Sequence, residues 1–277
     1  MTDNTLIDRR FVRLDHGLVH LRQAGADDAP PLLMLHASPA SSKPLEPLIA
    51  ALAPHYRVYA ADTPGNGESG PLDLAGPSLA DYARVMDDLC AALGHEKVAL
   101  YGTHTGAHIA IAWASRFPAR LQSMVLDGVA LLGPQMRQEF LERYAPHKQP
   151  EPDGSQFHWA WQFMRDQMIF FPHYKKDLEH LRPGGTFDAQ VLHDLTLDVL
   201  KALDTYHLPY EAVFRQDPIA EATEANVPAL VLTSDDGPIE SGMEPLIEAL
   251  PQAVTAQTDG TLAKKAAAIA TFLGDAP

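Results

Sequence analysis

The apolar residues of this chain fall into short runs that alternate with amphipathic segments of helical period. In the first half of the chain, the runs expected to form strands are 11–14, 18–21, 31–35, 57–61, 98–101 and 123–126. The segments expected to form helices are 42–52, 79–93 and one that ends near 117. The first two runs flank a glycine-containing turn and predict a hairpin, whereas the later alternation predicts a parallel sheet covered by helices on both faces.

The alternation of strands and helices is interrupted by a helical insertion. From 133 to 218 the pattern is helical and rich in aromatic residues, and no run reads as a buried strand. The alternation then resumes with a strand at 227–232, a helix at 242–250, a weaker strand at 253–257 and a final helix at 261–273. The sequence therefore predicts a core made of residues 1–132 and 219–277 and a separate helical region made of residues 133–218.

The charge and hydropathy of the chain narrow the range of partners. The formal net charge is −15 and the pI is about 5.2, so the surface repels nucleic acid and anionic membranes, and we expect neither as a partner. No apolar run approaches the length of a membrane span, and the first 13 residues contain no apolar signal core. We expect a cytoplasmic protein that acts on a small-molecule substrate, with a homodimer as an open alternative to a monomer.

One segment joins a predicted strand directly to a predicted helix through a turn that contains two glycines. The turn reads Gly102-Thr103-His104-Thr105-Gly106. This is the frame G-x-S-x-G of a nucleophile elbow, in which the central residue is strained and its side chain points out of the top of the sheet. Here His104 holds the position of the nucleophilic serine, and the central question is what a histidine does there.

Four motifs along the chain together resemble those of the α/β-hydrolase superfamily. In order, they are the loop His-Ala-Ser-Pro at 36–39, the turn Asp-Thr-Pro-Gly-Asn-Gly-Glu-Ser at 62–69, the elbow, and the strand and loop at 227–236. The resemblance implies an eight-stranded, mostly parallel sheet with helices on both faces and a helical cap inserted after strand 6. It also implies an oxyanion hole formed by the backbone N–H groups of Thr105 and of Ser38 or Ala37.

The usual Ser-acid-His triad of that superfamily is absent. The family pattern places the acid at Gly237, so Asp235 or Asp236 fills that position only with a small shift. Asp127, at the end of the sixth strand, is a second position for the acid. No histidine follows His207, so the late histidine that serves as the base is missing. A conventional serine-hydrolase mechanism is therefore excluded.

Three roles remain open for His104. Imidazole ordinarily titrates near neutral pH, so it can act as a general base for water or for a substrate proton. It can also act as a nucleophile through a transient acyl-imidazole. We expect the positive end of the following helix to favour the neutral imidazole. The third alternative is an inactive site in which His104 only fills space, but a silent elbow has no need of strain.

Two further histidines could belong to the same site. His108 lies four residues after His104, a spacing that resembles a metal site on one helix face, but it is expected to point at a buried neighbour. His36 heads the oxyanion loop, which it braces in the superfamily, and it is a candidate substrate contact. A metal site made of His36, His104 and a carboxylate is a weaker alternative, and we predict neither a metal nor a cofactor.

The predicted cap supplies the remaining candidates for substrate binding. His158, Trp161 and Arg165 fall at three- and four-residue spacings and therefore share one helix face. Either Trp161 packs and Arg165 pairs with a carboxylate, or this face covers the pocket and binds a substrate carboxylate or carbonyl. Tyr206 belongs to a second aromatic cluster that can line the same cavity.

The sequence favours a cofactor-independent enzyme that acts on a small ester, lactone or activated carbonyl compound. In this hypothesis His104 is the base or nucleophile beside a backbone oxyanion hole. A lyase or decarboxylase that cleaves a C–C bond needs only a base and an oxyanion hole, so it is the closest rival. The alternative from another class is a binding protein that retains the fold of a hydrolase and senses a ligand in the capped pocket.

Overall fold

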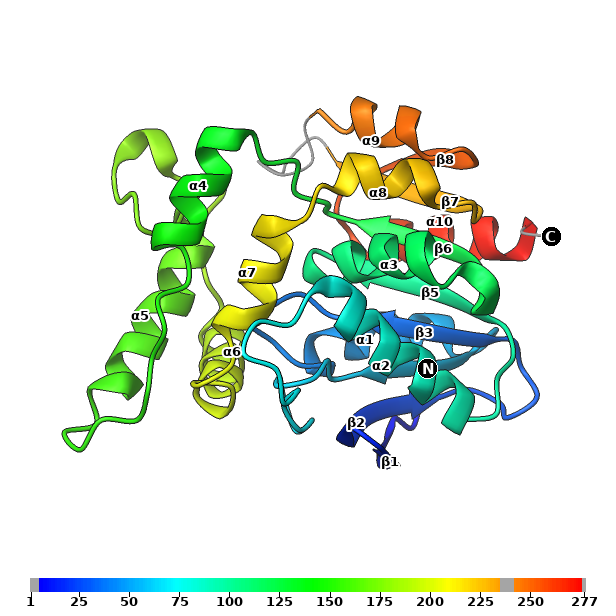
Figure 1. Cartoon of the computed structure of the whole chain (residues 1–277), viewed down its shortest axis with the longest axis horizontal. Helices are drawn as coiled ribbons and strands as arrows, with labels where there is room; N and C mark the ends of the chain where they lie inside the picture. The colour runs from blue at the N-terminus through cyan, green and yellow to red at the C-terminus, as the bar shows by residue number, and fades with distance from the viewer. Residues whose placement is uncertain (1–4, 235–241, 276–277) are drawn as a thin grey trace.

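An eight-stranded sheet forms the centre of the molecule (Figure 1). The structure is a computed structural model, and it describes residues 5–234 and 242–275. The strands lie in the order β1-β2-β4-β3-β5-β6-β7-β8. Only the pairs β1–β2 and β2–β4 are antiparallel, and the other pairs are parallel. The hairpin and the mostly parallel sheet are as predicted. The bounds are β1 Asp8–Leu14, β2 Gly17–Ala24, β3 Pro31–Leu35, β4 Arg57–Ala61, β5 Val98–Thr103, β6 Leu121–Asp127, β7 Ala229–Ser234 and β8 Ala253–Thr258.

Helices cover both faces of this sheet, because successive residues of its central strands point to opposite sides. Within β3, Leu33 and Leu35 belong to one buried cluster with α2 and α3, whereas Leu32 and Met34 belong to a second cluster with α1 and α10. None of the described helices is long and apolar enough to cross a membrane. The helices of the core are α1 Glu46–Leu52, α2 Leu79–Ala92, α3 Thr105–Arg116, α8 Pro218–Glu224, α9 Glu244–Ala249 and α10 Leu262–Asp275.

A cap of four α-helices lies between β6 and β7, at the left of Figure 1. The cap helices are α4 Pro134–Arg143, α5 Ser155–Ile169, α6 Ala189–Lys201 and α7 His207–Arg215. They form two layers, because α6 and α7 lie next to the core, whereas α4 packs on α7 and α5 packs on α6. The cap thus stands beyond the carboxyl ends of the parallel strands, where ligands bind in open α/β sheets.

Several predicted bounds differ from the observed ones, since β1 begins three residues earlier, β2 ends three residues later and β7 lies two residues further along than predicted. Two further differences concern helices. The helix predicted over 42–52 is divided into a 3-10 turn at Lys43–Leu45 and α1, and Pro44 and Pro47, near the starts of the two pieces, lack the N–H donors that one continuous helix needs. Helix α8 was not predicted as an element, because its seven residues are too few to show a helical period. Two further 3-10 turns lie at Pro118–Arg120 and Leu178–His180.

Helix α6 fastens the cap to loops of the core. The buried carboxylate of Asp198 accepts a hydrogen bond of 2.8 Å from the Ser41 hydroxyl. Just beyond the helix, the Thr205 hydroxyl donates a hydrogen bond of 2.6 Å to the carbonyl oxygen of Gly65. Because these groups are wholly or partly buried, separating cap from core at α6 requires each of them to find a new partner.

Helix α3 approaches the sheet so closely that only glycine fits at two positions. A Cβ atom on Gly102 would lie 2.3 Å from the carbonyl oxygen of Gly106, and a Cβ atom on Gly106 would lie 2.4 Å from the carbonyl oxygen of Leu35. Both distances are far below van der Waals contact, and the obstructing atoms belong to the backbone. The two glycines of the elbow therefore allow the turn from β5 into α3.

The first prediction tests this close approach. Within an ordinary helix, Gly→Ala stabilises by about 1 kcal/mol. For Gly106→Ala we expect the opposite sign, with the free energy of unfolding lowered by about 2–3 kcal/mol in urea titrations. Gly76→Ala is the matched control, since its added methyl group meets no atom within 4 Å. A Gly106→Ala variant as stable as the control would contradict the close approach.

Candidate active site

The turn between β5 and α3 holds His104 in a strained backbone conformation. His104 has φ 49° and ψ −112°, and among the described residues other than glycine it alone has positive φ. Its N–H donates a hydrogen bond of 2.8 Å to the carbonyl oxygen of Asp127, at the end of β6. Backbone strain of this kind costs about 1–3 kcal/mol and is concentrated at functional sites. The strained position is the one that the elbow motif predicts.

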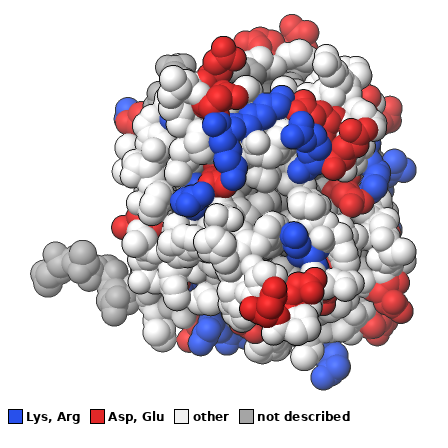
Figure 2. Space-filling model, turned by 90° about the vertical axis from the view of Figure 1, so that its left-hand side faces the viewer, with Lys and Arg blue, Asp and Glu red and all other residues white. Residues whose placement is uncertain are grey.

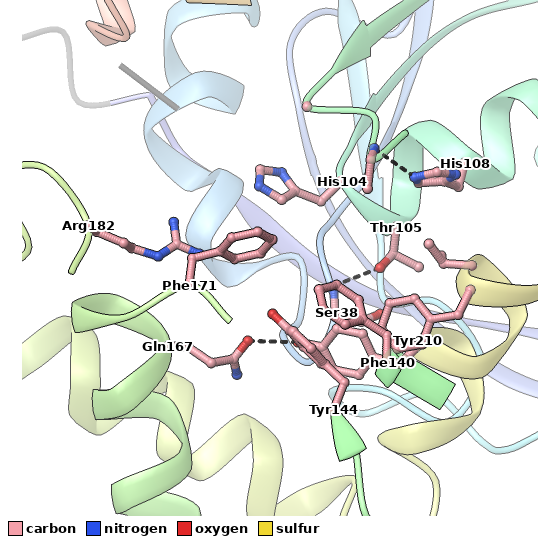
Figure 3. Close-up of a pocket in the computed structure, with 14 residues that line it drawn as sticks. Ser38, His104, Thr105, His108, Phe140, Tyr144, Gln167, Phe171, Arg182 and Tyr210 are labelled. Carbon is pink, nitrogen blue, oxygen red and sulfur yellow. Dashed lines mark hydrogen bonds between the residues drawn. The ribbon is translucent and has the colours of Figure 1, made fainter. Parts of the chain in front are cut away.

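The imidazole of His104 lies at the wall of a cavity (Figure 3). Its Nδ1 atom is 3.0 Å from the Thr103 hydroxyl oxygen. The ring also lies against Gly128, where a Cβ atom would come within 2.9 Å of the imidazole. The ring therefore lies close to both Thr103 and the bare backbone of Gly128.

The cavity lies between the core and the cap and has a volume of about 100 Å³. Ligand pockets of drug size hold about 300–1,000 Å³, so this cavity suits a small organic molecule. The core contributes polar residues and the cap contributes mainly aromatic rings (Figure 3). The lining residues from the core include Ser38, His104, Thr105, His108 and Gly128, and those from the cap include Phe140, Tyr144, Phe171, Tyr210 and Phe214.

Ser38 and Thr105, the predicted oxyanion residues, lie side by side in the cavity wall. The N–H of Ser38 donates a hydrogen bond of 3.3 Å to the Thr105 hydroxyl. Thr105 begins α3, so its own N–H belongs to the first turn, which has no partner within the helix. The positive end of the helix dipole adds to the attraction for an anion. An anion beside His104 can therefore be stabilised by the end of α3, and by the Ser38 N–H if the anion replaces the Thr105 hydroxyl as its acceptor.

Asp127, one of the two predicted acids, uses its carboxylate elsewhere. The Tyr101 hydroxyl donates a hydrogen bond to it, and the Lys265 ammonium pairs with it at 2.6 Å. Burial and the negative charge of Asp127 raise the pKa of Tyr101 well above its ordinary value. Asp127 meets His104 through its backbone carbonyl, so the structure assigns its side chain to fixing the end of β6. Asp236, the other predicted acid, lies outside the described residues.

His36 braces two loops, and the structure places it outside the cavity wall. Its Nδ1 donates a hydrogen bond of 2.7 Å to the carbonyl oxygen of Ala37, and its Nε2 accepts one of 2.9 Å from the N–H of Thr63. Burial lowers the pKa of His36, in agreement with a neutral ring that donates at one nitrogen and accepts at the other. Both ring nitrogens are used, so neither is available to a substrate.

The face of α5 that the sequence proposes for substrate binding does not line the cavity. His158 is exposed, and Trp161 is half-buried against the apolar core. The guanidinium of Arg165 pairs with the buried carboxylate of Asp166 at 2.7 Å. Of the two predicted roles for Arg165, this is the ion pair and not the substrate contact. Tyr206 is fully buried, and its hydroxyl donates to the carbonyl oxygen of Pro146 within the cap.

Other residues of the cap take their place in the cavity wall. Phe140 and Tyr144 are four residues apart and share one side of the end of α4, so their helical spacing was a signal in the sequence. Gln167 and Tyr210 are joined by a hydrogen bond of 2.9 Å from the phenol to the amide oxygen. Arg182 lies in an irregular segment with no periodicity, so no pattern in the sequence could have indicated it.

His108 is a satisfied buried histidine, as predicted. Its Nδ1 is 2.5 Å from the amide oxygen of Gln216, and its Nε2 accepts a hydrogen bond of 3.0 Å from the N–H of Ala130. Burial lowers its pKa to about 4, so the ring is neutral near pH 7. Within residues 5–234 and 242–275, no group of three or more His, Cys, Asp or Glu side chains could hold a metal ion.

A family model described as alpha/beta hydrolase fold matches residues 30–258. Solved structures agree with this match over nearly the whole chain. Epoxide hydrolase A from Mycobacterium thermoresistibile superposes with a TM-score of 0.75 at 19% identity, over 98% of this chain and 99% of that one. The enol-lactonase from Burkholderia xenovorans gives a TM-score of 0.72 at 19% identity, over 96% of this chain and 100% of that one. At such identities the likeness shows the fold alone.

Relatives of known sequence match a shorter stretch. The 2-hydroxy-6-oxononadienedioate/2-hydroxy-6-oxononatrienedioate hydrolase 1 of Dechloromonas aromatica is 33% identical over 136 residues, which are 45% of this chain and 46% of that protein. Carboxylesterase YbfK of Bacillus subtilis is 32% identical over 116 residues, which are 42% of this chain and 39% of that protein. The match thus spans less than half the length of these relatives.

The buried ion pair beneath the elbow gives the second prediction. Lys265→Met leaves the Asp127 carboxylate buried without its cation, so we expect the free energy of unfolding to fall by about 3 kcal/mol. Lys264→Met is the control, since the Lys264 side chain is 65% exposed. The double variant Asp127→Asn/Lys265→Met should recover more than half of the loss in urea titrations. If the loss in the double variant equalled the sum of the losses in Asp127→Asn and Lys265→Met measured singly, Asp127 and Lys265 would not be energetically coupled.

The third prediction concerns acid stability and His108. Its folded pKa is about 4, whereas an unfolded histidine has a pKa of about 6.5. Between these values the unfolded chain binds a proton that the folded protein does not, so stability falls as the pH falls through this window. At pH 5 the loss from His108 is about 2 kcal/mol relative to pH 7.5.

The variant His108→Gln should lack this part of the pH dependence, and exposed His55→Gln should retain it. Free energies of unfolding at pH 7.5 and pH 5 measure the difference for each protein. The same loss in His108→Gln as in the wild type would show that His108 is not the titrating group.

Proposed function

The chain belongs to the α/β-hydrolase fold family, and from that premise we propose that it is an enzyme that hydrolyses a small ester, lactone or activated carbonyl compound. In this proposal His104 acts on the substrate, and the N–H groups of Ser38 and Thr105 bind the oxyanion. The observation that carries the proposal is the strained His104, whose imidazole lies at the wall of a capped cavity. We also propose residues 1–132 and 219–277 as the catalytic core and 133–218 as the cap.

The strain at His104 supports an active role. A histidine that only filled space would gain nothing from positive φ, which a glycine or a changed turn would avoid. The fold instead maintains that conformation with a hydrogen bond from the His104 N–H to β6 and with two glycines that admit α3. These interactions offset the strain and keep the imidazole at the cavity.

General-base catalysis requires few groups at this site. His104 takes a proton from water, the hydroxide attacks the carbonyl carbon, and the oxyanion lies between the two backbone N–H groups. The tetrahedral intermediate then collapses, and the imidazolium returns the proton to the leaving group. If His104 is the nucleophile instead, its nitrogen forms an acyl-imidazole that water hydrolyses in a second step. Neither route uses a cofactor.

The names of the relatives support a carbonyl substrate. They include carboxylesterases and hydrolases of a hydroxy-oxo dioate among sequences, and an enol-lactonase among structures. Each of these names describes a hydrolysis or a lactone, although the sequence matches span less than half of each relative. We therefore keep the proposal at the level of a small ester, lactone or activated carbonyl compound.

The fourth prediction tests His104 directly. Purified wild-type protein should turn over compounds from a panel of short acyl esters and lactones, and His104→Ala should lower kcat/KM by about 100-fold or more. His104→Ser should not restore activity, because the other histidine among the described lining residues, His108, already bonds to Gln216 and Ala130 through its ring nitrogens. Exposed His55→Ala is the matched control and should retain full activity.

Three outcomes of this experiment are informative. An acyl adduct on His104, detected by mass spectrometry after rapid quenching, selects the nucleophile over the base. Cleavage of a C–C bond without addition of water would replace hydrolysis by a lyase reaction. If the wild type shows no turnover and His104→Ala binds a ligand equally well, the enzyme proposal is wrong and the protein is a ligand-binding relative.

A further inference from the structure

Arg182 is the one arginine, lysine or carboxylate side chain among the described residues that line the cavity. It lies between the 3-10 turn at 178–180 and α6, and it reaches the cavity from the cap (Figure 3). Apart from Arg182, the walls that the cap contributes are apolar or neutral. A single cation in such a wall is a feature that selects the charge of the ligand.

Arg182 has no acidic partner within the described part of the chain. Its Nε donates a long hydrogen bond of 3.4 Å to the carbonyl oxygen of Phe170, and its guanidinium lies 5.4 Å from the centre of the Phe171 ring. Several other basic residues of the cap are paired, and basic and acidic side chains lie together on its outer face (Figure 2). These pairs include Arg165–Asp166, Lys175–Glu139, Lys176–Asp166 and Lys201–Glu68.

The chain has 36 acidic residues and 21 basic ones, yet none of the described acidic side chains pairs with Arg182. The charge of Arg182 also acts on the cavity wall, since burial raises the pKa of Tyr144 to about 12 and Arg182 opposes that rise. The pKa of Tyr210, raised by burial, is opposed by Arg182 in the same way. The positive charge is therefore directed toward the cavity.

Arg182 and His104 approach the cavity from different sides (Figure 3). His104 and the oxyanion donors belong to the core, whereas Arg182 and Gln167 belong to the cap. Gln167 accepts a hydrogen bond from Tyr210 with its amide oxygen, and its amide nitrogen donates to the Met164 sulfur at 3.4 Å. Because sulfur is a weak acceptor, that N–H₂ group can serve as a second donor beside the guanidinium.

We infer that Arg182 binds a carboxylate of the substrate, so that the substrate is a carbonyl compound with an anionic end. This inference rests on the proposed function, which supplies the carbonyl at His104. The aromatic rings between the two sites fit an apolar segment that joins carbonyl and carboxylate. A planar guanidinium matches a carboxylate with two parallel hydrogen bonds. A single cation suits a monoanion better than a phosphate dianion.

The fifth prediction uses binding, so it does not depend on turnover. 4-Phenylbutyrate and its neutral isostere 4-phenylbutanamide are titrated by calorimetry into the wild type and into His104→Ala. Both proteins should bind the carboxylate about 10- to 100-fold more tightly than the amide. Arg182→Met should remove that difference, and Arg182→Lys should keep part of it, because lysine retains the charge without the planar fork.

Arg215→Met is the matched control, since it removes the same charge from an exposed position of the cap outside the cavity. Its preference for the carboxylate should equal that of the wild type.

Equal binding of the two probes by the wild type, no binding of either, or an unchanged preference in Arg182→Met would overturn the inference. Tighter binding of phenylpropyl phosphate than of 4-phenylbutyrate would overturn the choice of carboxylate. Loss of turnover in His104→Ala with the preference intact separates this inference from the proposed catalysis.

Discussion

The close contact of α3 with the sheet is the constraint on which the rest of the site depends. The backbone of Gly106 lies against Leu35, and the His104 N–H is bonded to the end of β6. Together these contacts hold the turn in a conformation that a free chain would avoid. The imidazole, the N-terminus of α3 and the loop that carries Ser38 then meet at the wall of one cavity, and all three belong to the core.

The ends of β5 and β6 are stabilised by charge as well as by packing. Tyr101 and Lys265 hold the carboxylate of Asp127 beneath the elbow, on the face of the sheet that α1 and α10 cover. The cavity lies on the other side of the elbow, where Gly128 leaves room for the imidazole. Two consecutive residues therefore border His104 in different ways, Asp127 through its backbone carbonyl and Gly128 by leaving space for the ring.

The sequence predicted the core more fully than the site. Strands β3 and β4 have the bounds that their apolar runs indicate, because a strand buried on both faces is apolar throughout. The position of His104 followed from the two glycines around it. Arg165 and Arg182 show the limit, since both are cap arginines and the one at helical spacing pairs with Asp166. Which arginine reaches the cavity depends on how the cap folds, which no local pattern records.

The two layers of the cap divide the walls of the cavity into two classes. Tyr210 and Phe214 belong to α7, which packs directly on α2 and α3, so their positions follow from the core. Phe140 and Gln167 belong to α4 and α5, which pack on α7 and α6. Substitutions in the outer layer can therefore alter which molecule fits without disturbing the elbow. The shape of the outer cavity wall and the geometry of the elbow are therefore held by separate sets of contacts, so one can change while the other is preserved.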